Sequence, residues 1–266
     1  MANPRIRFGR KARGFNPSIP HMSALTLGFA KAAPKLPASL DNTSKFPKDF
    51  NFGPMLNDQL GDCTCAAFYH ARQIWRAGAT SQLATDPDSD VLQLYEKAAG
   101  YDPSATNPQT GINPTDNGAQ EQVILQYLYK TGAPVGDGTS LDRILAYVEV
   151  DPRNVNDVKR TIYDCGVSYI GFVVPTSWTN GQIGTTWDVV PGDTPSNEGH
   201  AVILTGYDHD NFNVISWGRR YTMTKAFLQT YVDESYAIAD NSWVEATGKT
   251  PLGMSASQLV QVMQGL

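Results

Sequence analysis

Residues 57–79 read NDQLGDCTCAAFYHARQIWRAGA, and this stretch does most to decide the fold. Its spacing predicts a helix that begins at Cys63 and ends near Gly78. One stripe of that helix carries Cys63, Ala67, His70 and Ile74. A thiol in the first turn of a helix lies near free N–H groups and the positive end of the helix dipole. We therefore expect Cys63 to be favoured as a thiolate.

Further helices are predicted over 88–99, 119–130 and 155–165. After about residue 140 the pattern changes to short runs of β-branched and aromatic residues, which is typical of strands. These runs are AYVEVD (146–151), SYIGFVVP (168–175), HAVILTGYD (200–208) and FNVISWG (212–218). The last two flank a polar turn and predict a hairpin. A helical half followed by a β-rich half indicates the α+β class.

Four segments are predicted along the chain. Residues 1–52 form a basic, proline-rich arm, and 53–140 form a helical lobe with the cysteine helix. Residues 141–240 form a β-rich lobe, and 241–266 form a tail that ends in a helix. Asp233 and Glu234 fall in a stretch with helical character, where paired carboxylates usually lie on a solvated face.

Composition excludes several classes of protein. The chain has 266 residues with 41% hydrophobic residues, which excludes disorder over its whole length. It has no apolar run of the roughly 18–20 residues that a membrane helix needs, and no apolar stretch typical of a secretion signal. A net charge of −5 argues against a nucleic-acid partner. Three cysteines make no disulfide framework and fit a reducing compartment such as the cytoplasm.

The charge is unevenly spread along the chain. Residues 1–48 hold nine Lys or Arg and one acid, whereas the remainder holds 12 basic and 25 acidic residues. A basic arm on an acidic body is expected to lie along that body, or along an acidic assembly partner.

Cys63 and His200 are the strongest candidates for chemistry. His200 begins the strand HAVILTGYD and follows Cys63 by 137 residues, within the roughly 130–150 typical of one class of thiol enzymes. An imidazole beside a thiol lowers the thiol pKa and can later protonate a leaving group. Cys63 and Cys65 have no second pair of Cys or His at zinc spacing, so no metal site and no cofactor are expected.

The surrounding segments resemble the papain-like cysteine peptidases, and more closely their uncharacterised bacterial and phage members. QLGDCTCAAF resembles the family's nucleophile segment, TDNGAQEQVILQYL its groove loop and helix, and GHAVILTGYD with FNVISWG its histidine strand and Ser-Trp-Gly strand. The four segments stand in the family's order. The resemblance implies a two-lobed fold with a peptide or protein substrate in the cleft. It also implies substrate contacts from Asp116, Asn117, Gly118 and Trp217.

Two cysteines compete for the role of nucleophile. The family places an oxyanion-stabilising Gln six residues before its cysteine, and Gln59 stands six before Cys65. The bacterial branch instead resembles QLGDCT, which favours Cys63 and puts Asn57 in that position. Cys63 is also nearer the helix start, where the dipole acts. We expect Cys63 to be the nucleophile, with its own N–H and the amide of Asn57 or Gln59 as the oxyanion hole.

One departure from the family concerns the third catalytic residue. The family has Asn directly before Ser-Trp-Gly to orient the histidine, and this chain has Ile215 there. An isoleucine forms no hydrogen bonds. Ser216 and Asn213 are the nearest polar residues in sequence that could replace the Asn.

Three functions follow from these patterns. The first is a cysteine hydrolase that cleaves peptide or isopeptide bonds through a thioester. The second is a papain-like fold with weak or no catalysis, used for binding or as a structural protein, for instance in a phage particle. The third is a cell-wall amidase or endopeptidase that uses the same Cys–His pair. The basic arm, Ile215 and the lack of a full-length inhibitory pro-segment like the family's favour the second function, although these patterns do not exclude that an arm of about 50 residues blocks a cleft.

Overall fold

The computed structural model describes residues 7–11, 35–250, 255 and 257. Within them eight strands form one sheet, in the order β4-β10-β5-β7-β8-β9-β6, with β1 paired to β7. These strands are β1 (Leu40–Asp41), β4 (Ala146–Glu149), β5 (Ser168–Pro175), β6 (Thr186–Trp187), β7 (Pro195–Tyr207), β8 (Asn211–Ser216), β9 (Arg219–Thr224) and β10 (Val232–Ala239). Only the β6–β9 pair among them is parallel. A separate hairpin joins β2 (Ala133–Val135) to β3 (Ser140–Asp142).

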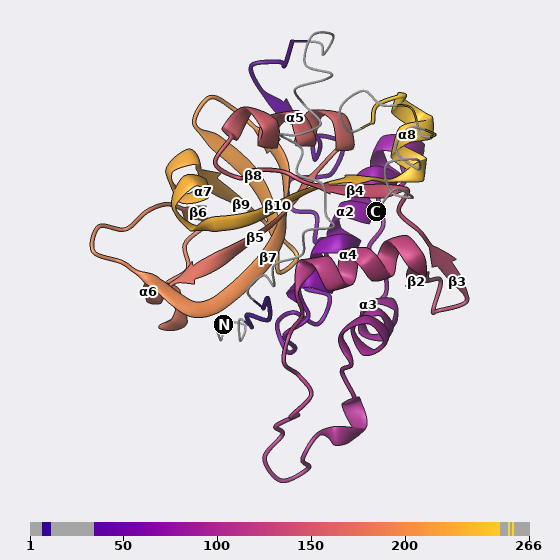
Figure 1. The fold of residues 1–266 in the computed structure, drawn as a ribbon, viewed down its shortest axis with the longest axis vertical. Coiled ribbons are helices and arrows are strands. Elements are labelled where there is room, and N and C mark those ends of the chain that lie inside the picture. Colours follow the sequence, from indigo (N-terminus) through magenta and orange to yellow (C-terminus); the bar gives the residue numbers. More distant parts are fainter. Residues whose placement is uncertain (1–6, 12–34, 251–254, 256, 258–266) are drawn as a thin grey trace.

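Of the described α-helices, three come before most of the sheet strands in the sequence, and the others lie between or after those strands (Figure 1). The helices are α2 (Cys63–Thr80), α3 (Asp88–Leu94) with the π-helical turn η1 (Tyr95–Ala99), the 3₁₀ turn η2 (Pro103–Ala105), α4 (Glu121–Lys130), α5 (Val155–Cys165), α6 (Thr176–Thr179), α7 (Lys225–Tyr231) and α8 (Asn241–Thr247). The predicted α+β class is confirmed. The predicted helices over 63–79, 88–99, 119–130 and 155–165 are present with small shifts at their ends. No helix among the described residues is long and apolar enough to cross a membrane.

Helix α2 is the central helix and is buried on nearly every side. Several of its buried polar side chains are tolerated because they form hydrogen bonds to backbone carbonyls of neighbouring segments. Gln73 is buried and donates from Nε2 to the carbonyl of Phe52, at 2.9 Å. Trp75 donates from Nε1 to the carbonyl of Cys165 at 2.7 Å, which ties α2 to the end of α5. Because α2 also packs against β7, its first residue is brought to the sheet.

The sheet separates two hydrophobic cores, and strand alternation decides which side chains enter each. Ile203 of β7 and Ile215 of β8 are paired across the ladder and belong to the core around α2. Their neighbours Leu204 and Val214 belong to the other core. The side chains of β8 therefore alternate between the two faces of the sheet. This alternation determines which residue of β8 faces His200.

The fold corrects one prediction and leaves others untested. Asp233 and Glu234 were expected on a solvated helix, but they lie on β10, and Glu234 is buried. The expectation is wrong because the helix α7 stops at Tyr231 and the next residues pair with β5. The predicted terminal helix lies outside the described residues, apart from Ser255 and Ser257. The predicted boundaries at 52, 140 and 240 remain predictions.

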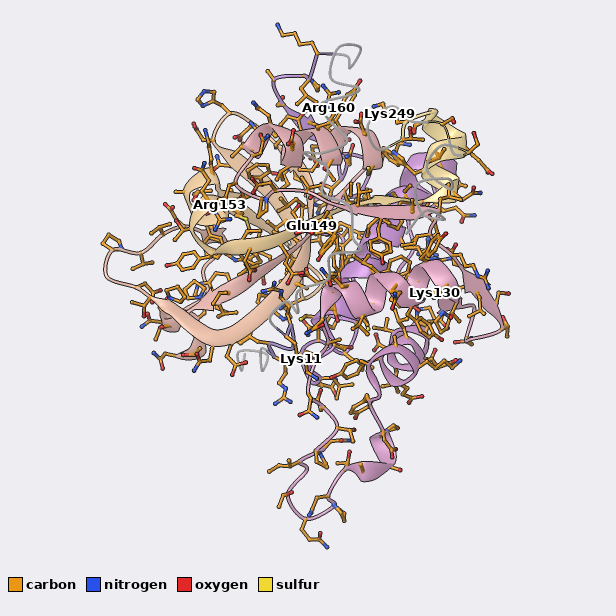
Figure 2. The ribbon with its side chains drawn as sticks, viewed as in Figure 1. Lys11, Lys130, Glu149, Arg153, Arg160 and Lys249 are labelled. Carbon is orange, nitrogen blue, oxygen red and sulfur yellow. The ribbon has the colours of Figure 1, made fainter. Side chains whose placement is uncertain are left out.

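The described parts of the basic arm lie along the body. Residues 40–41 pair with β7, and Phe46 and Phe52 enter the core around α2. The segment 7–11 lies against β7 and the loop before α4. Figure 2 labels Lys11, the last residue of that segment.

Candidate active site

Cys63 is the first residue of α2 and is buried beside β7. Hydrogen bonds from the backbone of Ala201 and Gly9 reach its thiol. Cys65 instead belongs to the hydrophobic core around α2, where it contacts apolar side chains. The two cysteines therefore have different surroundings, and Cys63 is the one beside the histidine strand.

His200 lies near the middle of β7 and is 1% exposed. Its Nε2 lies 2.8 Å from Oγ of Ser216, and its ring stacks on the indole of Trp217 with centroids 4.4 Å apart and planes at 9°. Trp217 has a positive φ of 46°, in the turn between β8 and β9. Within the described part of the chain Nδ1 of His200 has no hydrogen-bond partner. The ring is thus held by Ser216 and Trp217, and its second nitrogen is free for a proton.

The electrostatics of the site differ from the expected ion pair. Burial raises the pKa of the Cys63 thiol to about 12, although the backbone of Ala201 and Gly9 acts in the opposite direction. Burial, with a smaller contribution from His70, lowers the pKa of His200 to about 3. Both groups are neutral in this state. The expected thiolate is wrong here, because the loss of water outweighs the helix dipole at a fully covered sulfur.

The two candidates for the oxyanion amide also differ in position. Asn57 is 2% exposed and donates from Nδ2 to the carbonyl of Leu60 at 3.2 Å, in the loop that leads into α2. Gln59 is exposed to solvent. The buried side chain is the one that stands six residues before Cys63.

The segment 7–11 covers this site. The ring of Phe8 makes edge contacts with His200 and Trp217, with centroids 5.8 and 6.2 Å away. The N–H of Arg10 donates to the carbonyl of Gly199, directly before the histidine, at 3.0 Å. Phe8, Gly9 and Arg10 together explain why Cys63 and His200 are dry.

The loop directly before α4, which contains Gly118 and Ala119, binds segment 7–11 through backbone hydrogen bonds. The N–H of Ala119 donates to the carbonyl of Gly9 at 2.8 Å, and the N–H of Lys11 donates to the carbonyl of Ala119 at 2.9 Å. Gly118 has a φ of +69°, and a Cβ there would lie 1.6 Å from the Gly9 carbonyl oxygen. Only glycine fits this close approach.

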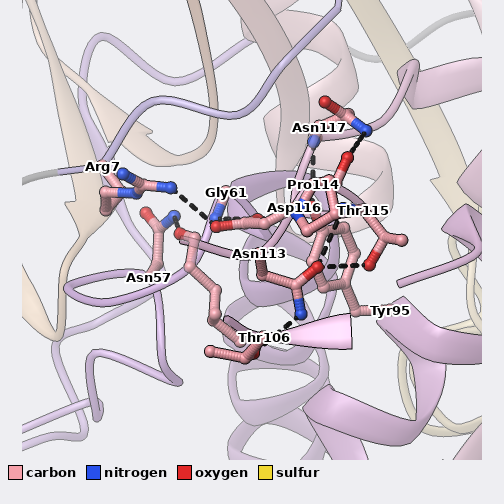
Figure 3. A network of polar contacts seen from close by, with 12 residues as sticks. Arg7, Asn57, Gly61, Tyr95, Thr106, Asn113, Pro114, Thr115, Asp116 and Asn117 are labelled. Atoms are coloured by element: carbon pink, nitrogen blue, oxygen red, sulfur yellow. Dashed lines mark hydrogen bonds and ion pairs between the residues drawn. The ribbon is translucent and has the colours of Figure 1, made fainter. Parts of the chain in front are cut away.

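Asp116 fixes the loop rather than standing free (Figure 3). Its Oδ1 accepts hydrogen bonds from the N–H of Gly61 at 2.8 Å and from the hydroxyl of Tyr95 at 2.9 Å. Its Oδ2 accepts one from Arg7 at 2.6 Å. The neighbouring Asn117 donates to the carbonyl of Pro114 at 2.7 Å and so also stabilises the loop. Of the residues expected to meet a substrate, Asp116 and Gly118 therefore meet Arg7 and Gly9 of the chain's own segment 7–11.

Several solved structures that superpose on this chain are cysteine proteases. Xylellain, a cysteine protease from Xylella fastidiosa, superposes with a TM-score of 0.63 at 16% identity, over 90% of this chain and 98% of that one. Digestive procathepsin L 3 of Tenebrio molitor gives 0.58 at 11%, over 89% and 76%. The Carica candamarcensis protease CMS1MS2, in complex with E-64, gives 0.51 at 17%, over 77% and 100%. No family model matches the sequence, and no curated protein matches it.

The chain has the papain-like fold. At 11–17% identity the likeness shows the fold alone, so activity has to be argued from the site. In this fold Cys63 begins the central helix and His200 lies on the adjacent strand.

A hollow of about 470 Å³ adjoins the candidate site at Trp217. Trp217 lines it, whereas Cys63 and His200 do not. The rest of its lining is Lys48, Asp49, Phe50, Asn51, Pro54, Asp58, Gly218, Arg219, Arg220 and Tyr221. Among the described residues, no group of three or more His, Cys, Asp or Glu side chains is placed so that it could hold a metal ion.

The sequence patterns missed the part that segment 7–11 plays at the site. No sequence pattern marks Arg10, Glu121 or Glu234 as site residues, although all three are buried and linked by ion pairs. The one signal that pointed to this contact was the basic charge of the arm against the acidic body.

Proposed function

We propose that the chain is a papain-like cysteine hydrolase that cleaves peptide or isopeptide bonds, with Cys63 as nucleophile and His200 as its base. The observation that carries the proposal is that the thiol of Cys63, at the start of α2, lies at the backbone of Ala201, the residue that follows His200, while Nε2 of His200 is held by Ser216 and its Nδ1 is unpartnered. A fixed ring with one free nitrogen is the arrangement that a proton shuttle needs.

In the proposed reaction segment 7–11 first leaves the site, and water and substrate replace it. His200 then takes the proton of Cys63, and the sulfur adds to the carbonyl carbon of the substrate. The backbone N–H of Cys63 and the amide of Asn57 would stabilise the oxyanion. The C–N bond breaks as His200 returns the proton to the departing amine. Water, deprotonated by His200, hydrolyses the thioester to a carboxylic acid and restores the thiol.

A peptide is the substrate class best supported by the groove. Backbone groups of Ala119 and Gly199 already bind an extended segment in the described state, because they pair with Gly9, Arg10 and Lys11. Such main-chain pairing suits extended peptides of many sequences.

The second candidate is a papain-like binding or structural protein with little catalysis. The neutral, dry state of Cys63 and His200 under segment 7–11 favours it. In that case the segment would be a permanent part of the fold rather than a removable cover.

Labelling of the thiols by iodoacetamide at about pH 6, mapped by mass spectrometry, separates the two candidates. We compare the full chain with Phe8→Ala, which removes the ring that lies against His200. The hydrolase predicts that Phe8→Ala speeds labelling of Cys63 but not of buried Cys65 and Cys165, and that adding His200→Ala abolishes the gain. Equal, slow labelling of all three cysteines in a folded Phe8→Ala chain would reject the hydrolase.

A further inference from the structure

Arg10 enters a buried pocket lined by three carboxylates, and this pocket has no part in the chemistry proposed above. Its side chain is 1% exposed. Nε lies 3.1 Å from Oε2 of Glu121, the first residue of α4, and a second nitrogen lies 2.8 Å from Oδ1 of Asp233. The third nitrogen forms an ion pair with Glu234. All three guanidinium nitrogens therefore have a carboxylate partner.

The pocket has the shape of a guanidinium group as well as its charge. Gly171 of β5 forms one wall, and a Cβ there would lie 2.3 Å from Nε of Arg10 and 2.3 Å from Oε2 of Glu121. The glycine is thus required for space. Tyr236 donates its hydroxyl to the other oxygen of Glu234 at 2.6 Å, which fixes that carboxylate. A planar cation with several N–H donors fits this arrangement better than the single ammonium of lysine.

Charge makes the pocket dependent on an occupant. Glu121 and Glu234 are 0% and 2% exposed, so without a cation they would repel each other in a dry environment. Burial raises the pKa of Glu121 well above its usual value, and Arg10 opposes that rise. Burial lowers the pKa of Arg10, but the three carboxylates raise it by more. The net pKa lies above its ordinary value, so the guanidinium stays charged.

The pocket opens directly beside the candidate nucleophile. Arg10 donates its N–H to the carbonyl of Gly199, next to His200, and the preceding residue Gly9 contacts the thiol of Cys63 through its backbone. Gly171 is paired with Ala201 in the sheet, next to the same histidine. A side chain in the pocket therefore holds the neighbouring main chain at Cys63.

We infer that Glu121, Asp233 and Glu234 form the specificity pocket of this site, and that it selects peptide substrates with an arginine side chain. Arg10 fills the pocket in the described state and is replaced by the arginine of a substrate when segment 7–11 leaves. The inference rests on the proposed hydrolase function for its substrate role, but the guanidinium preference can be tested without any turnover.

The binding test uses the full chain with Arg10→Ala, which vacates the pocket. Ethylguanidinium is expected to raise its Tm by about 2–4 °C, whereas the neutral isostere ethylurea is not. The matched control is Arg7→Ala, which removes a half-exposed arginine of the same segment and should respond equally to both compounds. Adding Gly171→Ala should abolish the rise in Arg10→Ala. An identical response to ethylguanidinium and ethylurea would overturn the pocket. Where Arg10→Ala does not fold alone, the refolding yield with each compound gives the same comparison.

The substrate test uses fluorogenic peptides that differ only in arginine, citrulline or lysine at each position before the cleaved bond. In Arg10→Ala one position should favour arginine over citrulline by at least about tenfold in kcat/KM. Glu234→Gln should reduce that preference, and Glu198→Gln, an exposed carboxylate on β7, should not. Cleavage without preference for arginine would overturn the inference. Absence of any cleavage or Cys63 labelling, together with a positive ethylguanidinium result, would reject the hydrolase and the substrate role and leave a guanidinium-binding pocket.

Discussion

Nε2 of His200 lies 2.8 Å from Oγ of Ser216, so the imidazole has a polar partner although the preceding position carries isoleucine. Alternation along β8 explains the pairing. Ile215 points into the core around α2, opposite Ile203, and its neighbour Ser216 consequently faces the other way, toward the histidine. The hydroxyl can accept or donate, so it can follow the ring through both protonation states.

Ser216→Ala should therefore make His200 a less effective base for Cys63 without unfolding the chain. A hydrogen bond to a charged group contributes about 1.5–3 kcal/mol, so loss of the partner of an imidazolium should slow Cys63 labelling or turnover by roughly tenfold to hundredfold. The rate is measured in the Phe8→Ala background, where the site is accessible, with Tm as a check on folding. Ser216→Thr keeps the hydroxyl and should retain more activity. Equal rates for Ser216, Ala and Thr would show that the hydrogen bond does not matter.

Ile215→Asn should destabilise the fold rather than improve catalysis. The family's sequence pattern suggested that an Asn at this position could orient the histidine. In the structure Ile215 is 0% exposed in the core around α2, so the amide would be buried away from His200. We expect a loss of about 3 kcal/mol in the free energy of unfolding. Urea denaturation measures the loss, and Ile215→Val, which keeps an apolar side chain, should lose only about 1 kcal/mol. A stable Ile215→Asn chain with faster Cys63 labelling would contradict this placement.

Local patterns predicted the elements that carry Cys63 and His200, because each lies in a long segment with a clear period. The 3.6-residue repeat located α2, and the β-branched runs located β5 and β7. The run VDESYAIA was harder, because charged residues interrupt it. A register shift between Val232 and Glu234 also breaks the alternation, so that Val232 and Tyr236 enter different cores while Glu234 is buried.

The contact of Arg10 with its carboxylates could not be predicted from periodicity. It joins residues separated by 111 and 224 positions, and the segment around Arg10 is too short to carry a pattern. The dry state of Cys63 was missed for the same reason. The helix dipole is visible in the sequence, whereas the burial that overrides it depends on which segment covers the helix start.

His70→Gln should change how stability depends on pH. His70 lies on α2 with Nε2 2.8 Å from the carbonyl of Gly53, and burial lowers its pKa to about 4. The folded state thus binds fewer protons than the unfolded state between about pH 4 and the ordinary value of about 6.5. The contribution of His70 is present above about pH 6.5 and is lost as the pH falls towards 4, by up to about 3 kcal/mol.

The measurement is the free energy of unfolding of the natural chain minus that of His70→Gln, from urea titrations between pH 4 and 7.5. This difference should shrink steadily on acidification, because glutamine cannot take up the proton. His209→Gln is the matched control, since that ring is 94% exposed in the turn between β7 and β8. A difference for His70→Gln that stays constant across the range would mean that the imidazole is not buried as a neutral group.

Asp62→Asn should stabilise the chain, and increasingly so at higher pH. Asp62 directly precedes Cys63, and burial raises its pKa well above the usual value, with Asn57 acting in the opposite direction. Since the folded state prefers the protonated acid, the contribution of Asp62 is present below about pH 4 and is lost as the pH rises towards its folded pKa. The loss is about 1.4 kcal/mol for each pKa unit, and asparagine avoids it because it cannot ionise.

Urea titrations of both chains between pH 4 and 8 test this, with the exposed Asp49→Asn as the control that should show no trend. The same substitution should speed labelling of Cys63 in the Phe8→Ala background only at a pH high enough to ionise Asp62, because only the charged carboxylate raises the thiol pKa. An advantage for Asp62→Asn that does not grow with pH would show that Asp62 is already ionised in the fold. The labelling gain would then appear at every pH tested, because the charge that raises the thiol pKa would be present throughout.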